Sequence, residues 1–297
     1  MPAETGSEKR VRGLTFAKSY TTLFRSMDAE MKIDRPQGMA LVTGSSSGIG
    51  LAYAKELARR GYDLLLVSNE QERLQQVADE LSKAFGVGAL PLYMDLARPE
   101  AARELYDHCK KEHLEIEVLV NNAGVFFFDD LTEVAASRIE TMIMLHVHTV
   151  TMLCHYFGAE MRQRGKGYIL NMSSMSAWTP APGISVYGAS KSYLRKLSQM
   201  LRYELRGNGV YVTAVCPGAV ATGLYNLSEK YQRLALRLGV MMTPERLARK
   251  AIRALFAHKD YILPGGINRF VILLLYLMPA QIIYWLKGHT KLYRYGR

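Results

Sequence analysis

A tyrosine and a lysine four residues apart, Tyr187 and Lys191, are the side chains in this sequence best suited to acid–base chemistry. A spacing of four places both on one face of a helix, one turn apart. A phenol with its usual pKa of about 10 is a weak catalyst near neutrality, but a neighbouring ammonium lowers that pKa. The pair could therefore donate a proton to an oxyanion or remove one from an alcohol. Ser174 adds a hydroxyl where we expect a strand to end.

A glycine-rich turn indicates a dinucleotide site. Residues 43–50 (TGSSSGIG) lie between an apolar run at 39–42 and a run with helical spacing that starts at residue 51. Glycines allow a tight turn, and the N–H groups at the start of a helix then face a pyrophosphate. The order of strand, turn and helix makes the motif more specific than the glycines alone. We expect contacts to the dinucleotide from Gly44, Ser46, Ser47, Gly48, Ile49 and Gly50.

The end of the second expected strand, Ser68-Asn69, bears on the choice of cofactor. An acidic residue here binds the ribose 2′-hydroxyl of NAD, and a basic one binds the 2′-phosphate of NADP. Neither is present, so no acid repels a phosphate, and Ser45, Ser46 and Asn69 could donate hydrogen bonds to one. We favour NADP(H), with NAD(H) as the alternative.

Two further strand ends complete the expected cofactor site. Asp95-Leu96 follows the third strand, where the Asp95 carboxylate could accept the adenine amino group or instead cap the next helix. The small residues of Asn122-Ala123-Gly124 follow the fourth strand. They would let the backbone pass under the adenosine ribose.

These segments belong to a chain in which apolar strands alternate with amphipathic helices. This alternation predicts a doubly wound parallel sheet with helices on both faces. We predict a single α/β domain over residues 37–268. The expected strands are 39–42, 63–68, 89–94, 118–120, 167–172 and 210–215, and the expected helices are 51–60, 70–85, 137–164 and 187–206.

Taken together, the motifs resemble those of the short-chain dehydrogenase/reductase family. The glycine turn, Asn121-Asn122-Ala123-Gly124, Ser174, Tyr187 with Lys191, and Pro217-Gly218 occur in that family's order and spacing over about 38–223. The resemblance implies a Rossmann-type fold with about seven parallel strands, and a homodimer or homotetramer. Tyr187 would be the proton donor, Ser174 would hold the carbonyl oxygen, and Lys191 would bind the nicotinamide ribose. The nicotinamide end would contact Pro217, Gly218, Val220 and Thr222.

One position departs from the family pattern. The long fourth helix usually carries an asparagine that supports a water between the lysine and solvent, and His146 takes that place here. An imidazole can hold a water and exchange protons near pH 7. We therefore include His146 as a catalytic residue that completes the relay. The alternative is a structural histidine bonded to a backbone carbonyl.

The segment after Thr222, about 223–245, is strongly apolar, and we expect it to form a substrate lid. Three phenylalanines at 126–128 and Trp178 lie beside the expected mouth. An apolar pocket suits a hydrophobic ketone. We favour a 3-keto lipid such as 3-ketosphinganine, with a steroid as the alternative. These side chains could also be core or dimer contacts.

The net charge of +11 is concentrated near the C-terminus. Residues 1–222 hold 25 Lys/Arg and 24 Asp/Glu, whereas residues 223–297 hold 13 and 3. The last segment, 269–297, joins an apolar run (270–286) to a basic end, a layout similar to that of 3-ketosphinganine reductases and 17β-hydroxysteroid dehydrogenases. It could span a bilayer, dock in the plane of an anionic membrane, or pack on the pocket or a partner. Long aliphatic runs between the basic residues argue against nucleic acid.

Cysteine usage and the N-terminus bear on location. Cys109, Cys154 and Cys216 are too few and too far apart for a disulfide framework or a metal cluster, which suits a reducing compartment. No secretory signal is recognisable, so we expect a cytoplasmic protein, at most on the cytoplasmic face of a membrane. Residues 1–36 are expected to be an extension, disordered or artefactual in part. Within it SYTTLFRS resembles translated adapter DNA, which predicts a natural start at Met27 or Met31.

The sequence thus predicts an NAD(P)H-dependent oxidoreductase that reduces a hydrophobic ketone with Tyr187 as proton donor. The alternative from another class is a non-catalytic, membrane-associated dinucleotide sensor. The intact set of Ser174, Tyr187 and Lys191 argues against it.

Overall fold

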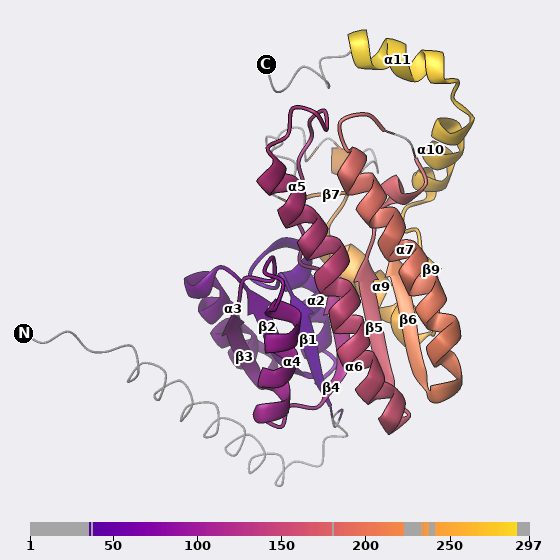
Figure 1. Cartoon of the computed structure of the whole chain (residues 1–297). Helices are drawn as coiled ribbons and strands as arrows, with labels where there is room; N and C mark the ends of the chain where they lie inside the picture. Colours follow the sequence, from indigo (N-terminus) through magenta and orange to yellow (C-terminus); the bar gives the residue numbers. More distant parts are fainter. Residues whose placement is uncertain are drawn as a thin grey trace, which may run out of the picture.

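The computed structural model describes residues 36, 38–179, 181–222, 233, 235–237 and 241–289. The predictions for the N-terminal extension therefore lie outside the described residues, and so does most of the expected lid. The described residues form a central sheet flanked by helices, with two further helices beyond one end of the sheet (Figure 1).

The sheet has seven parallel strands in the order β3-β2-β1-β4-β5-β6-β9, which confirms the predicted doubly wound fold. Its strands are β1 (Met39–Thr43), β2 (Asp63–Ser68), β3 (Ala89–Tyr93), β4 (Ile116–Asn121), β5 (Gly167–Met172), β6 (Val210–Val215) and β9 (Tyr261–Ile262). The chain order reverses at β1, which pairs with both β2 and β4. Ligands of such sheets bind at the carboxyl ends of the strands beside this reversal.

Alternating side chains of the strands form two cores. Val42 of β1 packs with the helices α2 (Gly48–Ala58), α3 (Gln71–Phe85) and α9 (Pro244–Phe256). Its neighbour Leu41 packs with α4 (Ala101–Lys111), α6 (Val150–Arg164) and α7 (Ser185–Leu205) on the opposite face. Strands covered on both faces must be apolar throughout, because their side chains point in both directions.

The predicted helix at 51–60 lies at Gly48–Ala58 in the structure. It begins earlier because the Leu51 N–H already bonds the Ser47 carbonyl of the turn at 3.1 Å. The predicted strand at 118–120 is longer at both ends, since the flanking Glu117 and Asn121 are also buried. The long helical stretch predicted at 137–164 is not one regular helix. It consists of α5 (Ala136–Ile143), a π-helix at Met144–Thr149, and α6. The π-helix contains His146 and inserts a wider turn at the edge of the site.

Of the predicted lid, only residues 233, 235–237 and 241–245 are described. Met241 and Met242 form β8, which pairs with β7 (Ala219–Val220) beside the cavity. Met241 is buried, and Met242 packs against the core on the α2 face. These two methionines are therefore core residues, which was the alternative considered for the apolar segment. Thr243 then caps α9, its hydroxyl accepting a hydrogen bond from the Arg246 N–H at 3.2 Å.

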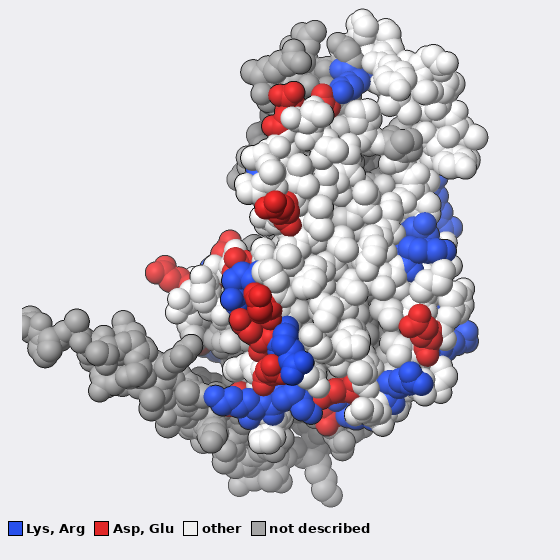
Figure 2. Space-filling model, viewed as in Figure 1, with Lys and Arg blue, Asp and Glu red and all other residues white. Residues whose placement is uncertain are grey.

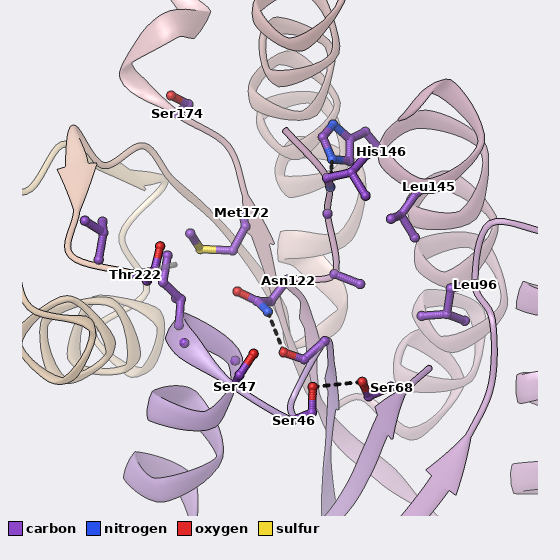
Figure 3. A pocket seen from close by; sticks show the side chains of 18 of the residues that line it. Ser46, Ser47, Ser68, Leu96, Asn122, Leu145, His146, Met172, Ser174 and Thr222 are labelled. Carbon is purple, nitrogen blue, oxygen red and sulfur yellow. Dashed lines mark hydrogen bonds between the residues drawn. The ribbon is translucent and has the colours of Figure 1, made fainter. Parts of the chain in front are cut away.

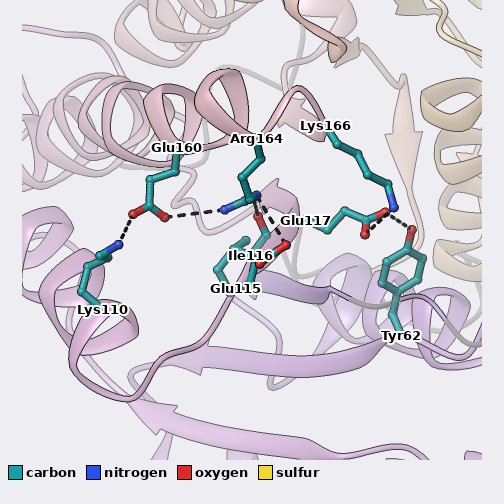
Figure 4. Close-up of polar contacts among 8 residues, drawn as sticks. All are labelled: Tyr62, Lys110, Glu115, Ile116, Glu117, Glu160, Arg164 and Lys166. Carbon is teal, nitrogen blue, oxygen red and sulfur yellow. Dashed lines mark hydrogen bonds and ion pairs between the residues drawn. The ribbon is translucent and has the colours of Figure 1, made fainter.

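A polar network closes the sheet at the amino ends of its strands (Figure 4). The Glu117 carboxylate, at the start of β4, is almost fully buried. It accepts a hydrogen bond from the Tyr62 hydroxyl at 3.0 Å and pairs with the Lys166 ammonium at 3.0 Å. Gly38 packs directly against Glu117, where a Cβ atom would lie 2.5 Å from the Glu117 Cβ. The network thus joins β2, β4 and β5 at the end opposite the site.

Beyond β9, the helices α10 (Gly266–Leu277) and α11 (Ala280–His289) leave the body of the fold. They lie past the carboxyl ends of the strands, nearest the edge of the sheet formed by β6 and β9 (Figure 1). The three cysteines are buried and free, at positions 109, 154 and 216.

Candidate active site

A cavity of about 500 Å³ opens at the carboxyl ends of the strands (Figure 3). All but one of the residues that we predicted to bind the cofactor or take part in the chemistry line it. The exception is Ser45, which is buried and whose hydroxyl donates a hydrogen bond to the Val67 carbonyl at 3.4 Å. The predicted residues in its wall are Gly44, Ser46, Ser47, Gly48, Ile49, Gly50, Ser68, Asn69, Asp95, Leu96, Asn122, Ala123, Gly124, His146, Ser174, Tyr187, Lys191, Pro217, Gly218, Val220 and Thr222.

The glycine turn is held against the loop that follows β4. The Thr43 hydroxyl accepts hydrogen bonds from the Asn122 and Ala123 N–H groups at 2.9 and 3.0 Å. The Asn122 side-chain amide donates to the Thr43 and Gly44 carbonyls. Gly44 has a φ of +64°, and a Cβ there would lie 2.9 Å from the Ala123 Cα. Only glycine allows this approach, which brings the two cofactor loops together.

The start of α2 is suited to an anion. A Cβ at Gly50 would lie 1.9 Å from the Gly44 carbonyl oxygen, so the turn and the helix can touch only through glycine. The first-turn N–H groups of a helix have no partner within the helix and carry partial positive charge. Thr222 lies opposite, its Cγ2 3.5 Å from a Cβ built at Gly48. The cradle therefore fits the pyrophosphate of a dinucleotide.

At the end of β2, Ser68 donates a hydrogen bond to the Ser46 hydroxyl at 2.9 Å and accepts one from the Glu70 N–H at 3.3 Å. Asn69 is exposed beside them. A second, more open hollow shares Asn69 with the first cavity and is lined also by Glu70, Gln71, Glu72, Arg73 and Tyr93. Arg73 places a guanidinium near the end of β2, in a position that sequence reasoning missed.

Asp95 is exposed on the cavity wall, where its Oδ1 accepts a hydrogen bond from the Ala97 N–H at 2.9 Å. The next helix, α4, begins at Ala101 with Glu100 at its cap position. Asp95 therefore closes a local turn and is not the cap of α4. Its neighbour Leu96 is buried, and the Leu96 carbonyl accepts a hydrogen bond from the Thr149 hydroxyl of the π-helix.

Lys191 and Tyr187 lie on one face of α7, as their spacing predicted. The Lys191 side chain is 5% exposed, and its Nζ donates to the Met172 carbonyl at 2.9 Å. This nitrogen lies 5.5 Å from the centre of the Tyr187 ring. Burial lowers the pKa of Lys191 to about 8. The ammonium is therefore still charged near neutral pH, where it favours the phenolate form of its neighbour.

Aromatic neighbours hold the Tyr187 ring. Phe126 meets it edge-on at 5.0 Å between ring centres, and His146 does so at 5.9 Å. Ser174 follows β5, and its Oγ accepts a hydrogen bond from the Ser176 N–H at 3.2 Å as it caps a short 3-10 helix. Trp178, at the end of that helix, lies under the guanidinium of Arg195. The hydroxyl of Ser174 and the phenol of Tyr187 thus line the same cavity.

His146 is 1% exposed, and both of its ring nitrogens bond protein groups. Nε2 accepts a hydrogen bond from the Val125 N–H at 3.1 Å, so in the neutral ring the proton lies on Nδ1. Nδ1 is 2.9 Å from the Ser190 hydroxyl, which in turn donates to the Tyr187 carbonyl at 2.8 Å. Burial, reinforced by the Lys191 charge, keeps the pKa of His146 well below its usual value. This geometry does not support the hypothesis that the ring exchanges protons near pH 7, nor the alternative of a bond to a backbone carbonyl.

Gly124 makes room for this imidazole. A Cβ on Gly124 would lie 2.8 Å from the His146 Nε2. At the other end of the cavity, a Cβ on Gly218 would lie 2.6 Å from the Asn268 Oδ1 of α10. The Pro217 carbonyl accepts a hydrogen bond from the Met175 N–H at 2.8 Å, which ties the predicted nicotinamide end to the Ser174 loop.

Sequence reasoning missed five residues of the cavity wall. Four of them follow or precede a predicted residue directly, so adjacency to a motif was the available signal. They are Met94, Val125, Leu145 and Ser173, and the fifth is Met172 at the end of β5. Ser190, which links His146 to Tyr187, carried no signal beyond its place between Tyr187 and Lys191.

Comparisons with known proteins all indicate the same protein family. The pattern described as short chain dehydrogenase matches residues 38–232. The human very-long-chain 3-oxoacyl-CoA reductase is 37% identical over 195 residues, which cover 62% of this chain and 60% of that protein. The hydroxysteroid dehydrogenase-like protein 1 of Gallus gallus is 36% identical over 193 residues (64% and 57%). The human protein named inactive hydroxysteroid dehydrogenase-like protein 1 is 32% identical over 189 residues (62% and 56%). The matched region thus spans about three fifths of these relatives.

Solved structures agree. A short-chain dehydrogenase from Sphingobium yanoikuyae in complex with NADPH is 30% identical, with a TM-score of 0.70 over 85% of this chain and 96% of that one. The bulky-bulky ketone specific alcohol dehydrogenase from Comamonas testosteroni is 29% identical, with a TM-score of 0.68 over 85% and 94%. On the matched pattern, these similarities and the geometry above, the chain belongs to the short-chain dehydrogenase/reductase family.

Proposed function

We propose that the protein is an NADPH-dependent reductase of a long-chain 3-oxo lipid. One observation carries the proposal: the ammonium of Lys191 is buried beneath Tyr187, in the same cavity as Ser174 and the glycine cradle. Burying a charge beside a phenol is costly, and it has a use where that phenol must give up a proton. Within the 3-oxo lipids, the names of the relatives favour an acyl thioester over the 3-ketosphinganine that the sequence favoured.

In this mechanism Ser174 donates a hydrogen bond to the ketone oxygen and holds it near Tyr187. As a hydride reaches the carbonyl carbon, negative charge develops on that oxygen, and the Tyr187 hydroxyl gives it the proton. The Lys191 ammonium stabilises the phenolate that remains. The dinucleotide, when bound, supplies the hydride. In this mechanism the rate enhancement comes from holding the ketone and the dinucleotide together in one cavity, and from the positive charge of Lys191 beside Tyr187.

The residues at the end of β2 suit the extra phosphate of NADP. Ser46 and Ser68 present hydroxyls there, and Asn69 presents an exposed amide. Arg73, on the rim of the adjoining hollow, is the cation that could pair with a 2′-phosphate, although Glu70 and Glu72 share that rim. We propose that Arg73 offsets these two acids and sets the preference for NADPH over NADH.

His146 acts in this proposal as a positioning residue. Its neutral ring joins the loop at Val125, which lines the cofactor cavity, to Ser190 and so to the backbone of Tyr187. The family's water-binding asparagine is thereby replaced by a direct link between the cofactor loop and the helix that carries the proton donor.

An initial-rate assay tests the proposal. The purified protein would be offered NADPH or NADH with a long-chain 3-oxoacyl thioester, 3-ketosphinganine, and 17- and 3-ketosteroids. We expect NADPH-dependent turnover of the thioester, and a loss of at least about a thousandfold in kcat in Tyr187→Phe, since the substitution removes the acid but leaves the ring. Arg73→Gln should raise the KM for NADPH about tenfold and leave that for NADH unchanged.

Each other outcome has a definite meaning. Turnover of a steroid alone would move the protein to the hydroxysteroid dehydrogenases, which the name of the Gallus gallus relative also suggests. Binding of the dinucleotide with no turnover of any ketone would favour the non-catalytic sensor, in line with the human relative named inactive. Equal activity of wild type and Tyr187→Phe would exclude the proposed mechanism.

A further inference from the structure

The helices α10 and α11 expose an unusual amount of apolar surface. Nine of the sixteen large apolar side chains that are exposed among the described residues belong to these two helices. Phe270 is 65% exposed and Tyr276 is 74% exposed. The others are Ile267, Leu273, Leu274, Leu277, Ile282, Tyr284 and Trp285. Single exposed apolar residues are ordinary, but nine of them on two successive helices indicate an interaction site. We call these nine side chains the apolar patch.

The exposed side chains of α10 have a helical order. Ile267, Phe270, Leu274 and Leu277 follow one another at spacings of three and four, so they share one face. Val271, Ile272 and Leu275 are partly covered on the other side. Both faces of α10 are therefore apolar. The exposed face has no partner within the described part of the chain.

The start of this helical pair contacts the wall of the active-site cavity, and its end contacts the loop after β4. At the start of α10, Asn268 is buried against Gly218 of the cavity wall and donates a hydrogen bond to the Pro264 carbonyl. Near the end of α11, the Lys287 ammonium pairs with the Asp130 carboxylate at 2.9 Å, in the loop after β4. Figure 1 shows α10 and α11 beyond the carboxyl ends of the strands, and the residues that line the cavity lie at those same ends.

The charge of this segment is of one sign. The sequence has no Asp or Glu after Asp260, whereas Arg269, Lys287, Lys291, Arg294 and Arg297 are basic. Figure 2 shows a largely uncharged surface over α10 and α11, while acidic and basic side chains mix over the opposite end of the molecule. Of these cations, Arg269 and Lys287 lie on the two helices among the described residues. Apolar side chains beside cations suit a surface that is apolar within and anionic at its edge, as a membrane with acidic lipids is.

The helix lengths determine how a membrane could be met. α10 has 12 residues and α11 has 10, and Met278-Pro279 separates them. Among the described residues, no helix has the length and apolar character needed to cross a bilayer. Tyr276, Tyr284 and Trp285 carry a polar atom on an aromatic ring, which suits the level of the lipid headgroups. A second copy on this face would bring the Arg269 and Lys287 of both copies together, and the sequence after Asp260 holds no acid to pair with them.

We infer that α10 and α11 dock in the plane of an anionic lipid surface and bring the mouth of the active site against it. Docking follows from the patch and its charge alone. Its consequence for the substrate, which would enter from the lipid layer, rests on the proposed function.

Flotation of the full-length protein with vesicles tests this inference. We expect it to float with vesicles that contain phosphatidylserine and much less with pure phosphatidylcholine, and high salt should weaken binding. The variant Phe270→Gln/Leu274→Gln/Trp285→Gln keeps every charge and should lose at least about tenfold in affinity, because it removes apolar side chains from the contact. The matched control Met200→Gln/Tyr203→Gln changes exposed apolar residues of α7 and should bind like wild type.

Three results would overturn the inference: no flotation of wild type with either vesicle, equal flotation of wild type and the triple variant, or equal loss in the control. A wild-type oligomer that the triple variant splits without lipid would assign the face to a second copy instead. Unchanged dinucleotide binding by the triple variant shows that it is folded. Because flotation needs no substrate, failure of docking and failure of the proposed reaction are distinguishable.

Discussion

Lys191 holds its charge in a position that is 5% exposed, and this has a measurable cost. Its pKa is about 8 in the folded protein, against 10.5 for an ordinary lysine. Between these two pH values the unfolded chain binds more protons than the folded chain, so the free energy of unfolding rises with pH. Below about pH 8 the full cost is present. A residue kept at this cost is better explained by the chemistry of Tyr187 than by stability.

Lys191→Met should therefore stabilise the enzyme while abolishing turnover. At pH 7 we expect its free energy of unfolding to exceed that of wild type by about 1–3 kcal/mol, since the depressed pKa corresponds to at most roughly 3 kcal/mol and a hydrogen bond to the Met172 carbonyl is lost. The gain should shrink as pH rises from 8 towards 10.5. Urea unfolding across this range measures it. Lys196→Met, an exposed lysine on the same helix, should change stability little, and parallel pH curves for wild type and Lys191→Met would contradict the argument.

The hydrogen bonds of His146 can be separated with matched substitutions. His146→Asn keeps a donor near the Ser190 hydroxyl, and His146→Gln keeps an acceptor near the Val125 N–H. His146→Gln loses the bond to Ser190 on the Tyr187 side, so we expect it chiefly to lower kcat about fivefold. His146→Asn loses the bond to the cofactor loop at Val125, so we expect it chiefly to raise the KM for NADPH about fivefold. Each change corresponds to the loss of one hydrogen bond of about 1 kcal/mol. Phe should show both effects.

Nuclear magnetic resonance of the ring nitrogens checks the same assignment directly. The proton of His146 should stay on Nδ1 from about pH 6 to about pH 8, since its pKa lies well below the usual value. A ring that titrates near pH 6.5, or that carries its proton on Nε2, would restore the proton relay that the sequence suggested.

At the scale of the elements, Glu117 of β4 links this strand to β2 and β5 at their amino ends. Its carboxylate bonds Tyr62 before β2 and Lys166 before β5, and it is 5% exposed (Figure 4). Burial, together with Glu117, raises the pKa of Tyr62, which keeps that hydroxyl a donor. A buried carboxylate with two partners is expensive to remove, because both partners lose their acceptor.

Glu117→Ala should lower the free energy of unfolding by about 2–4 kcal/mol and leave kcat unchanged, since the network lies at the end of the sheet opposite the cavity. Glu115→Ala is the control, because Glu115 is an exposed partner of Arg164 and should contribute at most about 0.5 kcal/mol. Thermal and urea unfolding measure both. Equal destabilisation by the two substitutions would mean that burial of the Glu117 carboxylate has no special effect.

Elements with strong periodicity were predictable from the sequence, and irregular ones were not. The strands Asp63–Ser68, Gly167–Met172 and Val210–Val215 have the predicted bounds, because each is an apolar run closed by a change in polarity. The π-helix at Met144–Thr149 was missed, since one extra residue in a turn does not alter the spacing of apolar residues enough to be noticed. The partners of His146 were missed for the same reason, as they depend on where that turn places the ring.

At the scale of the whole molecule, the two ends of the sheet have different tasks. The amino ends carry the buried Glu117 carboxylate, paired with the exposed ammonium of Lys166, and a mixed-charge surface, which serve stability. The carboxyl ends carry the cavity and the exposed helices α10 and α11, which serve binding. The sequence indicated the basic, apolar C-terminal segment but not where it lies, because only the fold shows that α10 begins against Gly218 of the cavity wall and that α11 pairs with Asp130.

The contact between Gly124 and His146 has a consequence for how this enzyme can evolve. Gly124 has no positive φ, so its backbone would accept another residue, and what excludes a Cβ is the imidazole 2.8 Å away. Substitutions at the two positions must therefore occur in a fixed order. A larger residue can replace Gly124 only after a smaller one has replaced His146. The replacement of His146 by a smaller side chain opens paths that are closed to the present enzyme, and the reverse step is open only to descendants that still have glycine at 124.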